Sequence, residues 1–105
     1  MSKVVELKSL GQLDMLLATN RVVVVDFSAD SWCVPCQRLS PHYQAASEQL
    51  DEAVLAKVDV DEHPEFAHQF SVMGVPTVLA FREQKLVGPV KGRTVIQLVN
   101  EISSI

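Results

Sequence analysis

Residues 22–36, VVVVDFSADSWCVPC, carry the strongest structural signal in this chain. The run from Arg21 to Phe27 is β-branched and lacks polar alternation, which is typical of a strand buried on both faces in the centre of a sheet. A Cys-x-x-Cys motif, Cys33 and Cys36, follows and opens a helix that we expect to reach Leu50. A buried strand that leads through a cysteine pair into a helix predicts an α/β fold.

The segments on either side of this stretch predict the remaining elements. We expect further strands at 4–7, 53–60, 77–81 and 85–90, because these runs are short and apolar. Ser9 and Thr94 are placed to cap two helices, and Pro64 is placed in the first turn of a third. The predicted order is βαβαβαββα, a sheet covered by helices on both faces. In such folds functional sites lie at the carboxyl ends of parallel strands, where Cys33 is expected.

Length and composition favour a single globular domain over residues 1–105. The chain has 105 residues, 48% of them apolar, and a formal net charge of −4. Its nine Lys and Arg residues are scattered, which argues against a nucleic-acid partner. No apolar run approaches the roughly 20 residues that span a bilayer, and no secretory segment is recognisable. We therefore expect a cytoplasmic protein with no membrane partner.

The only two cysteines of the chain form the Cys-x-x-Cys motif. In a reducing compartment such a pair indicates redox or metal chemistry, because so short a loop adds little stability. A helix N-terminus lowers the pKa of a thiol placed there, so Cys33 is predicted to be the attacking thiol at an exposed tip. Cys36 lies one turn later on the same face, from which it can resolve a mixed disulfide.

Two other interpretations of the cysteines remain open at this stage. They could be an inert buried pair, since free cysteine is often part of a core. They could also join His63 and His68 in a Cys₂His₂ zinc site. The apolar content of the chain and the position of His68 between Phe66 and Phe70 make zinc the weaker alternative.

Asp26 is unusual because it lies inside the buried apolar run. Desolvation there raises the pKa of a carboxyl group towards neutrality, and Asp26 could then exchange a proton with Cys36. Alternatively, Asp26 is a hydrogen-bonded polar group near a strand end. Lys57 is the only charge inside the other central strand and is the predicted partner of Asp26, although its side chain could instead extend to solvent.

Three further residues point to recognition of a partner. Trp32 adjoins the cysteines and could offer a flat contact surface. Pro76 cannot donate to a sheet and should begin a strand. With a cis Val75–Pro76 bond, the backbone of Val75 would lie beside Cys33 as a short edge for a client segment.

Together these residues resemble the thioredoxin family over nearly the whole chain. The supporting segments are Val24–Ala29, Trp32-Cys33-x-Pro35-Cys36, Pro41, Ala56–Asp59, Gly74–Thr77 and Gly92. The resemblance implies a thioredoxin fold: a mixed sheet of about five strands flanked on both faces by four helices, with a cis Val75–Pro76 bond.

The resemblance also implies how the site works. Cys33 would be the nucleophile, Cys36 the resolving thiol, Asp26 the buried acid/base and Lys57 its neighbour. The client groove would be formed by Trp32, Val34, Pro35, Gly74, Val75, Pro76 and Gly92. No cofactor or metal would be bound, and electrons would come from NADPH through a thioredoxin reductase to disulfide-containing client proteins. We further expect a monomer.

The chain departs from the family pattern at three places. Val34 replaces the usual glycine between Cys33 and Pro35, and residues there help to set the redox potential. Asp30-Ser31 adds one residue before Trp32. Gln84 stands in a turn where glycine is usual, which predicts an unfavourable φ.

The sequence therefore supports, first, an enzyme that reduces protein disulfides by exchange through Cys33 and Cys36. The alternatives are a binding module on the same fold with incidental thiols, and a weakly oxidising exchanger.

Overall fold

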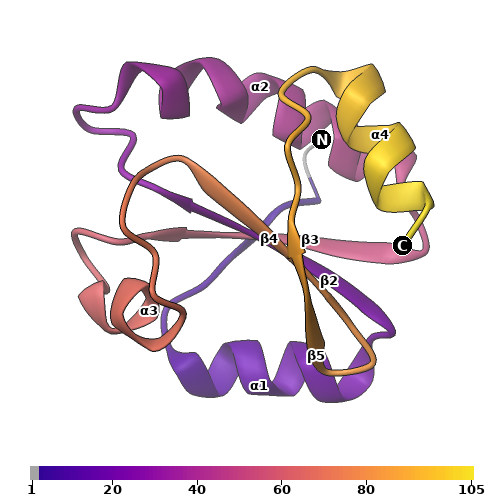
Figure 1. Ribbon diagram of the computed structural model, residues 1–105, viewed down its shortest axis with the longest axis horizontal. Helices are drawn as coiled ribbons and strands as arrows, with labels where there is room; N and C mark the ends of the chain where they lie inside the picture. The colour runs from indigo at the N-terminus through magenta and orange to yellow at the C-terminus, as the bar shows by residue number, and fades with distance from the viewer. Residues whose placement is uncertain (1–2) are drawn as a thin grey trace.

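The computed structural model describes residues 3–105 and has the predicted order of elements (Figure 1). The strands are β1 (Val5–Glu6), β2 (Val22–Ser28), β3 (Ala53–Asp59), β4 (Thr77–Arg82) and β5 (Lys85–Pro89). The helices are α1 (Leu10–Thr19), α2 (Val34–Gln49), α3 (Pro64–Gln69) and α4 (Val95–Ser103). The first strand is shorter than predicted, although the Leu7 amide still donates to the Lys57 carbonyl oxygen at 2.8 Å.

The strands form one mixed sheet in the order β1-β3-β2-β4-β5. Strand β2 is central, parallel to β3 and antiparallel to β4, and all seven of its residues are buried. This confirms the prediction from its unalternated apolar run. Because β2 and β3 are parallel, their carboxyl ends meet at one edge of the sheet, and the turn to Cys33 starts there.

The helices form two layers, α2 and α4 on one face of the sheet and α1 and α3 on the other (Figure 1). Alternate side chains of β2 enter the two cores: Val22 and Val24 pack with α2 and α4, whereas Val23 and Val25 pack with α1 and α3. The β2 backbone and its side chains are therefore shielded from water on both sides.

Local capping sets where the helices begin. The Ser9 hydroxyl accepts from the Gln12 amide at 3.1 Å, and the Thr94 hydroxyl accepts from the Gln97 amide at 3.3 Å. Pro64 opens α3, as predicted. Cys33 is the N-cap of α2, and its sulfur accepts from the Cys36 amide. The cap therefore places the cysteine pair at the sheet edge.

The β4–β5 turn is backbone-strained, as the sequence predicted. Glu83 and Gln84 connect paired Arg82 and Lys85, and their φ angles are 50° and 71°. Such a two-residue hairpin turn favours Asn and Gly, because side chains with a Cβ are disfavoured at positive φ.

We predict that Gln84→Gly stabilises the protein. Removing the Cβ relieves the left-handed strain, and the gain, after the extra entropy of the unfolded chain, is about 0.5–1 kcal/mol. Urea unfolding measures it. The matched control is Gln44→Gly at an exposed site inside α2, which should destabilise by about 1 kcal/mol. A loss of stability in Gln84→Gly would contradict the account of the turn.

Candidate active site

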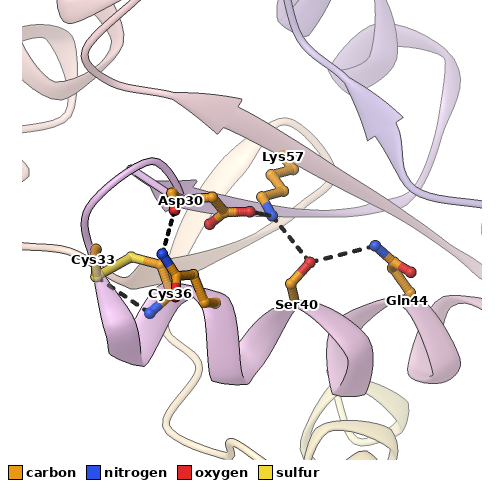
Figure 2. Close-up of polar contacts among 7 residues, drawn as sticks. Asp30, Cys33, Cys36, Ser40, Gln44 and Lys57 are labelled. Carbon is orange, nitrogen blue, oxygen red and sulfur yellow. Dashed lines mark hydrogen bonds and ion pairs between the residues drawn. A yellow bond between two sulfur atoms is a disulfide. The ribbon is translucent and has the colours of Figure 1, made fainter.

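The cysteine pair forms a disulfide at the N-terminus of α2 (Figure 2). The Cα atoms of Cys33 and Cys36 are 5.2 Å apart, and the Cys36 amide donates to the Cys33 sulfur at 3.2 Å. Amides at a helix N-terminus that are not used within the helix stabilise negative charge. The arrangement therefore favours a thiolate at Cys33 whenever the disulfide is opened.

The expectation that Cys33 lies at an exposed tip is wrong. Cys33 is only 4% exposed, and Cys36 is fully buried. Ala29, Val60 and Val75 pack around the pair, and the Val75 carbonyl oxygen lies 3.8 Å from the Cys33 sulfur. Val75, in the loop before β4, covers the pair. This loop is distant from the cysteines in sequence, so the residues around the cysteines do not reveal their burial. The Val75–Pro76 bond is cis, as the resemblance implied.

Two hollows flank the disulfide. One, of about 210 Å³, is lined by Trp32, Val60, Ala67, Val72, Met73, Gly74 and Val75. The other, of about 320 Å³, is lined by Pro35, Arg38, Leu39, His42, Pro76 and Arg93. Most of the predicted groove residues thus lie in one hollow or the other, and half-exposed Val34 belongs to the cysteine motif.

Trp32 is 62% exposed, and its indole N–H donates to the Asp61 carboxylate at 2.7 Å. Met73, 99% exposed, lines the same hollow. Neither Asp61 nor Met73 was singled out from the sequence, because only the fold brings the ends of β3 and α3 to the cysteines.

Gly92 is buried where the chain turns into α4. A Cβ on this residue would lie 2.8 Å from the Gln97 Cβ and 2.9 Å from the Gln97 carbonyl carbon. Its amide also donates to the Glu101 carboxylate at 2.5 Å. Close packing against α4 is therefore sufficient to explain a glycine here, and a contribution to the client groove stays a prediction.

Asp26 is the buried carboxyl group of the site. It is fully buried, and neither of its carboxyl oxygens has a hydrogen-bond partner within residues 3–105. Desolvation raises the pKa of Asp26 to about 7, against the opposing attraction of Lys57. The alternative of a hydrogen-bonded carboxyl near a strand end does not agree with these contacts.

Lys57 is the neighbour of Asp26, as the resemblance implied, but the two side chains do not form the hypothesised pair. Asp26 and Lys57 are neighbours across β2 and β3, but the Lys57 ammonium forms its ion pair with Asp30 and also donates to the Ser40 hydroxyl at 3.2 Å (Figure 2). The Lys57 side chain is 12% exposed, so it does not extend to solvent either. Asp30 lies in the turn between β2 and α2, and its carboxylate takes the place at the ammonium that was predicted for Asp26.

The histidines do not join the cysteines. His68 is exposed, and His63 lies 3.6 Å from the Glu65 carboxylate. Within residues 3–105 there is no group of three or more His, Cys, Asp or Glu side chains that could hold a metal ion. In the same part of the chain, no helix has the length and apolar character required to cross a membrane.

A reactive cysteine pair at a helix N-terminus, on the edge of a mixed α/β sheet and beside a buried carboxyl group, defines the class of thiol-disulfide oxidoreductases. The family model named Thioredoxin matches residues 4–104. The chain belongs to the thioredoxin family, and its activity is protein-disulfide oxidoreduction.

Individual relatives agree with this assignment. A thioredoxin of Mycoplasma genitalium is 33% identical over 101 residues, covering 92% of this chain and 98% of the relative. Part of a bifunctional thioredoxin reductase/thioredoxin of Mycobacterium leprae is 43% identical over 68 residues, 64% of this chain and 15% of that protein. The structure of a mutant thioredoxin from Halobacterium salinarum superposes with a TM-score of 0.87 at 37% identity, covering 97% of this chain and 89% of that one.

We predict that burial of Asp26 makes the stability of the oxidised protein depend on pH. The folded state keeps the carboxyl proton up to about pH 7, whereas the unfolded chain releases it near the ordinary aspartate pKa of 3.8. The contribution of Asp26 to the free energy of unfolding is therefore highest below pH 4. It falls by about 4 kcal/mol as the pH rises to 7. Urea unfolding from pH 4 to 8 should show this fall, and Asp26→Asn should lack it. Equal pH slopes in the two proteins would contradict it.

We also predict that Asp30→Asn lowers the pKa of Asp26. The substitution removes a negative charge that raises this pKa and leaves the Lys57 ammonium, which lowers it, without its carboxylate partner. A ¹³C NMR titration of the Asp26 carboxyl carbon measures the shift. The control is Asp51→Asn, which removes an exposed acid whose partner is Lys3. An unchanged or raised Asp26 pKa in Asp30→Asn would show that the ion pair does not act on Asp26.

Proposed function

We propose that the chain reduces disulfide bonds of client proteins with Cys33 as the nucleophile and Cys36 as the resolving thiol. The observation that carries this assignment is the Cys36 amide, which donates to the Cys33 sulfur at the first turn of α2. The complete burial of Cys36 supports the same order of attack, because an incoming client sulfur meets Cys33 first.

The exchange proceeds in two displacements. The Cys33 thiolate attacks one client sulfur, forming a mixed disulfide and releasing the other client sulfur as a thiolate. The Cys36 thiolate then attacks the Cys33 sulfur, which forms the Cys33–Cys36 disulfide and releases the second client thiolate. Two electrons pass to the client, and its two thiolates take up the two protons that the cysteine thiols gave up.

Asp26 is proposed to accept the proton of Cys36 before the second displacement. A carboxyl group with a pKa near 7 can take up and release a proton at neutral pH, which suits a general base. Lys57 acts on this step through its charge, since its ammonium is held by Asp30 rather than by Asp26.

Client recognition is proposed to use the surface around the disulfide. Trp32, Gly74 and Val75 line one hollow and Pro35 and Pro76 the other. The Val75 backbone beside Cys33 offers a short edge to an extended client segment. The side chain of Val34 and the backbone of Gly92 complete the proposed set.

Dithiol exchange of this kind requires no bound cofactor, because the two thiols carry the electrons. We propose that they are restored from NADPH through a thioredoxin reductase, a partner suggested by the Mycobacterium leprae relative named as reductase and thioredoxin in one chain. The proposed setting is the cytoplasm, where the reducing potential favours the dithiol form, and the proposed working unit is the monomer.

Single substitutions of the cysteines test these roles. Cys36→Ser should react once with an oxidised client such as insulin and accumulate a mixed disulfide, because the resolving thiol is missing. Cys33→Ser should form no mixed disulfide, and both variants should lose at least 10³-fold in NADPH-coupled turnover, an order expected when a nucleophile is removed. Non-reducing electrophoresis and mass spectrometry identify the adduct.

A mixed disulfide through Cys36 in the Cys33→Ser protein, at the wild-type rate, would reverse the assignment. The double Ser variant separates the exchanger from a binding module, because a binding module would keep its client affinity and its biological effect. The midpoint potential separates a reductant from a weak oxidant, because the reductant has the more negative value.

A further inference from the structure

The larger hollow beside the disulfide combines an apolar floor with positive charge. Pro35, Leu39 and Pro76 supply the apolar surface, and Arg38 and Arg93 supply two guanidinium groups. They come from α2 and from the loop before α4. No lining residue of this hollow carries a carboxylate, and within residues 3–105 neither arginine forms an ion pair.

One of the two guanidinium groups is anchored by the backbone. Arg93 Nη1 donates to the Val90 carbonyl oxygen at 3.0 Å and to the Gly92 carbonyl oxygen at 2.9 Å. These contacts hold the charge at the wall of the hollow instead of leaving it on a freely moving side chain. Planar guanidinium groups are well suited to bind carboxylates, because they donate two parallel hydrogen bonds.

The hollow adjoins the reacting sulfur. Pro35 lies inside the cysteine motif, and Pro76 follows Val75, whose carbonyl oxygen is 3.8 Å from the Cys33 sulfur. A client segment whose cysteine reaches Cys33 therefore passes the mouth of this hollow, and the side chains near that cysteine can enter it.

The charges on the opposite flank have the other sign. The smaller hollow is apolar, and beside it Asp61 binds the Trp32 indole, with Asp59 and Glu62 in the same turn. A protein with a formal net charge of −4 thus shows two cations on one side of its disulfide and carboxylates on the other.

We propose that the hollow between Pro35, Pro76, Arg38 and Arg93 is a subsite for an acidic side chain of the client protein, next to the client's disulfide. The proposal rests on the exchange reaction proposed above and adds the class of preferred clients: protein segments with Asp or Glu close to the target cysteine. The carboxylate pairs with the guanidinium groups while its methylene carbons contact Pro35, Leu39 and Pro76. An acidic residue on the Trp32 side meets repulsion, so the charge also sets the direction in which the segment lies.

Two disulfide peptides that differ only in charge provide the test. One carries two Glu residues beside its disulfide and the other carries two Gln residues. The pre-reduced protein is mixed with each peptide at low ionic strength, and quenched samples are separated by chromatography to give second-order rate constants. The net charge of the protein alone predicts slower reduction of the Glu peptide. We expect it instead to react roughly two- to five-fold faster, the upper part of the range for one exposed ion pair.

Two variants that each remove one positive charge show whether the preference for the Glu peptide depends on Arg38. Arg38→Gln should bring the Glu-to-Gln rate ratio to one or below, whereas Arg82→Gln, at the far end of β4, should keep the wild-type ratio. Arg38 is substituted instead of Arg93, because Arg93 also binds the backbone of its own loop and its charge lowers the pKa of Asp26. High salt should reduce the wild-type ratio towards one.

The outcomes are distinct. A wild-type ratio at or below one overturns the subsite, and so does an equal fall of the ratio in Arg38→Gln and Arg82→Gln, which would indicate net charge alone. Failure to reduce the Gln peptide as well would overturn the exchange reaction itself.

Discussion

The start of helix α2 at Cys33 is the constraint on which the site depends. The Cys33 sulfur receives the Cys36 amide only because the helix begins there, at the carboxyl end of a strand buried on both faces. The strand holds that end of the sheet rigidly, and the helix supplies amides to stabilise a thiolate. If the helix began a turn earlier or later, the same two cysteines would lie in a core or a loop without this stabilisation.

Burial of Asp26 is the second requirement, and it works against stability. The two cores on either side of β2 remove water from the carboxyl group and raise its pKa to about 7, so that it can exchange a proton at neutral pH. Pairing Asp26 directly with Lys57 would stabilise the fold but would favour the charged carboxylate. Because the Lys57 ammonium is paired with Asp30, Asp26 keeps the raised pKa that the proposed proton transfer needs. The protein is less stable above pH 4 as a result.

The sequence predicted the features that arise from local chemistry. The run through β2 and the caps at Ser9 and Thr94 follow from residue types in a short window, and the structure confirms them. The strained φ of Gln84, which the structure also confirms, was expected from the family pattern instead. The partner of Lys57 and the burial of Cys33 could not be predicted in that way. Both depend on contacts between segments far apart in the sequence, since Asp30 reaches β3 and Val75 covers the disulfide. The cationic hollow is of the same kind, because its two arginines lie on different elements.

Local and long-range contacts together fix the turn between β2 and α2. The Ala29 carbonyl oxygen accepts from the amides of both Trp32 and Cys33, at 3.2 and 2.9 Å, which closes the turn directly after β2. The Asp30–Lys57 ion pair ties the turn to β3, and the Trp32–Asp61 hydrogen bond ties it to the segment that follows β3. With both ends of the turn held, Cys33 is kept in place as the cap of α2.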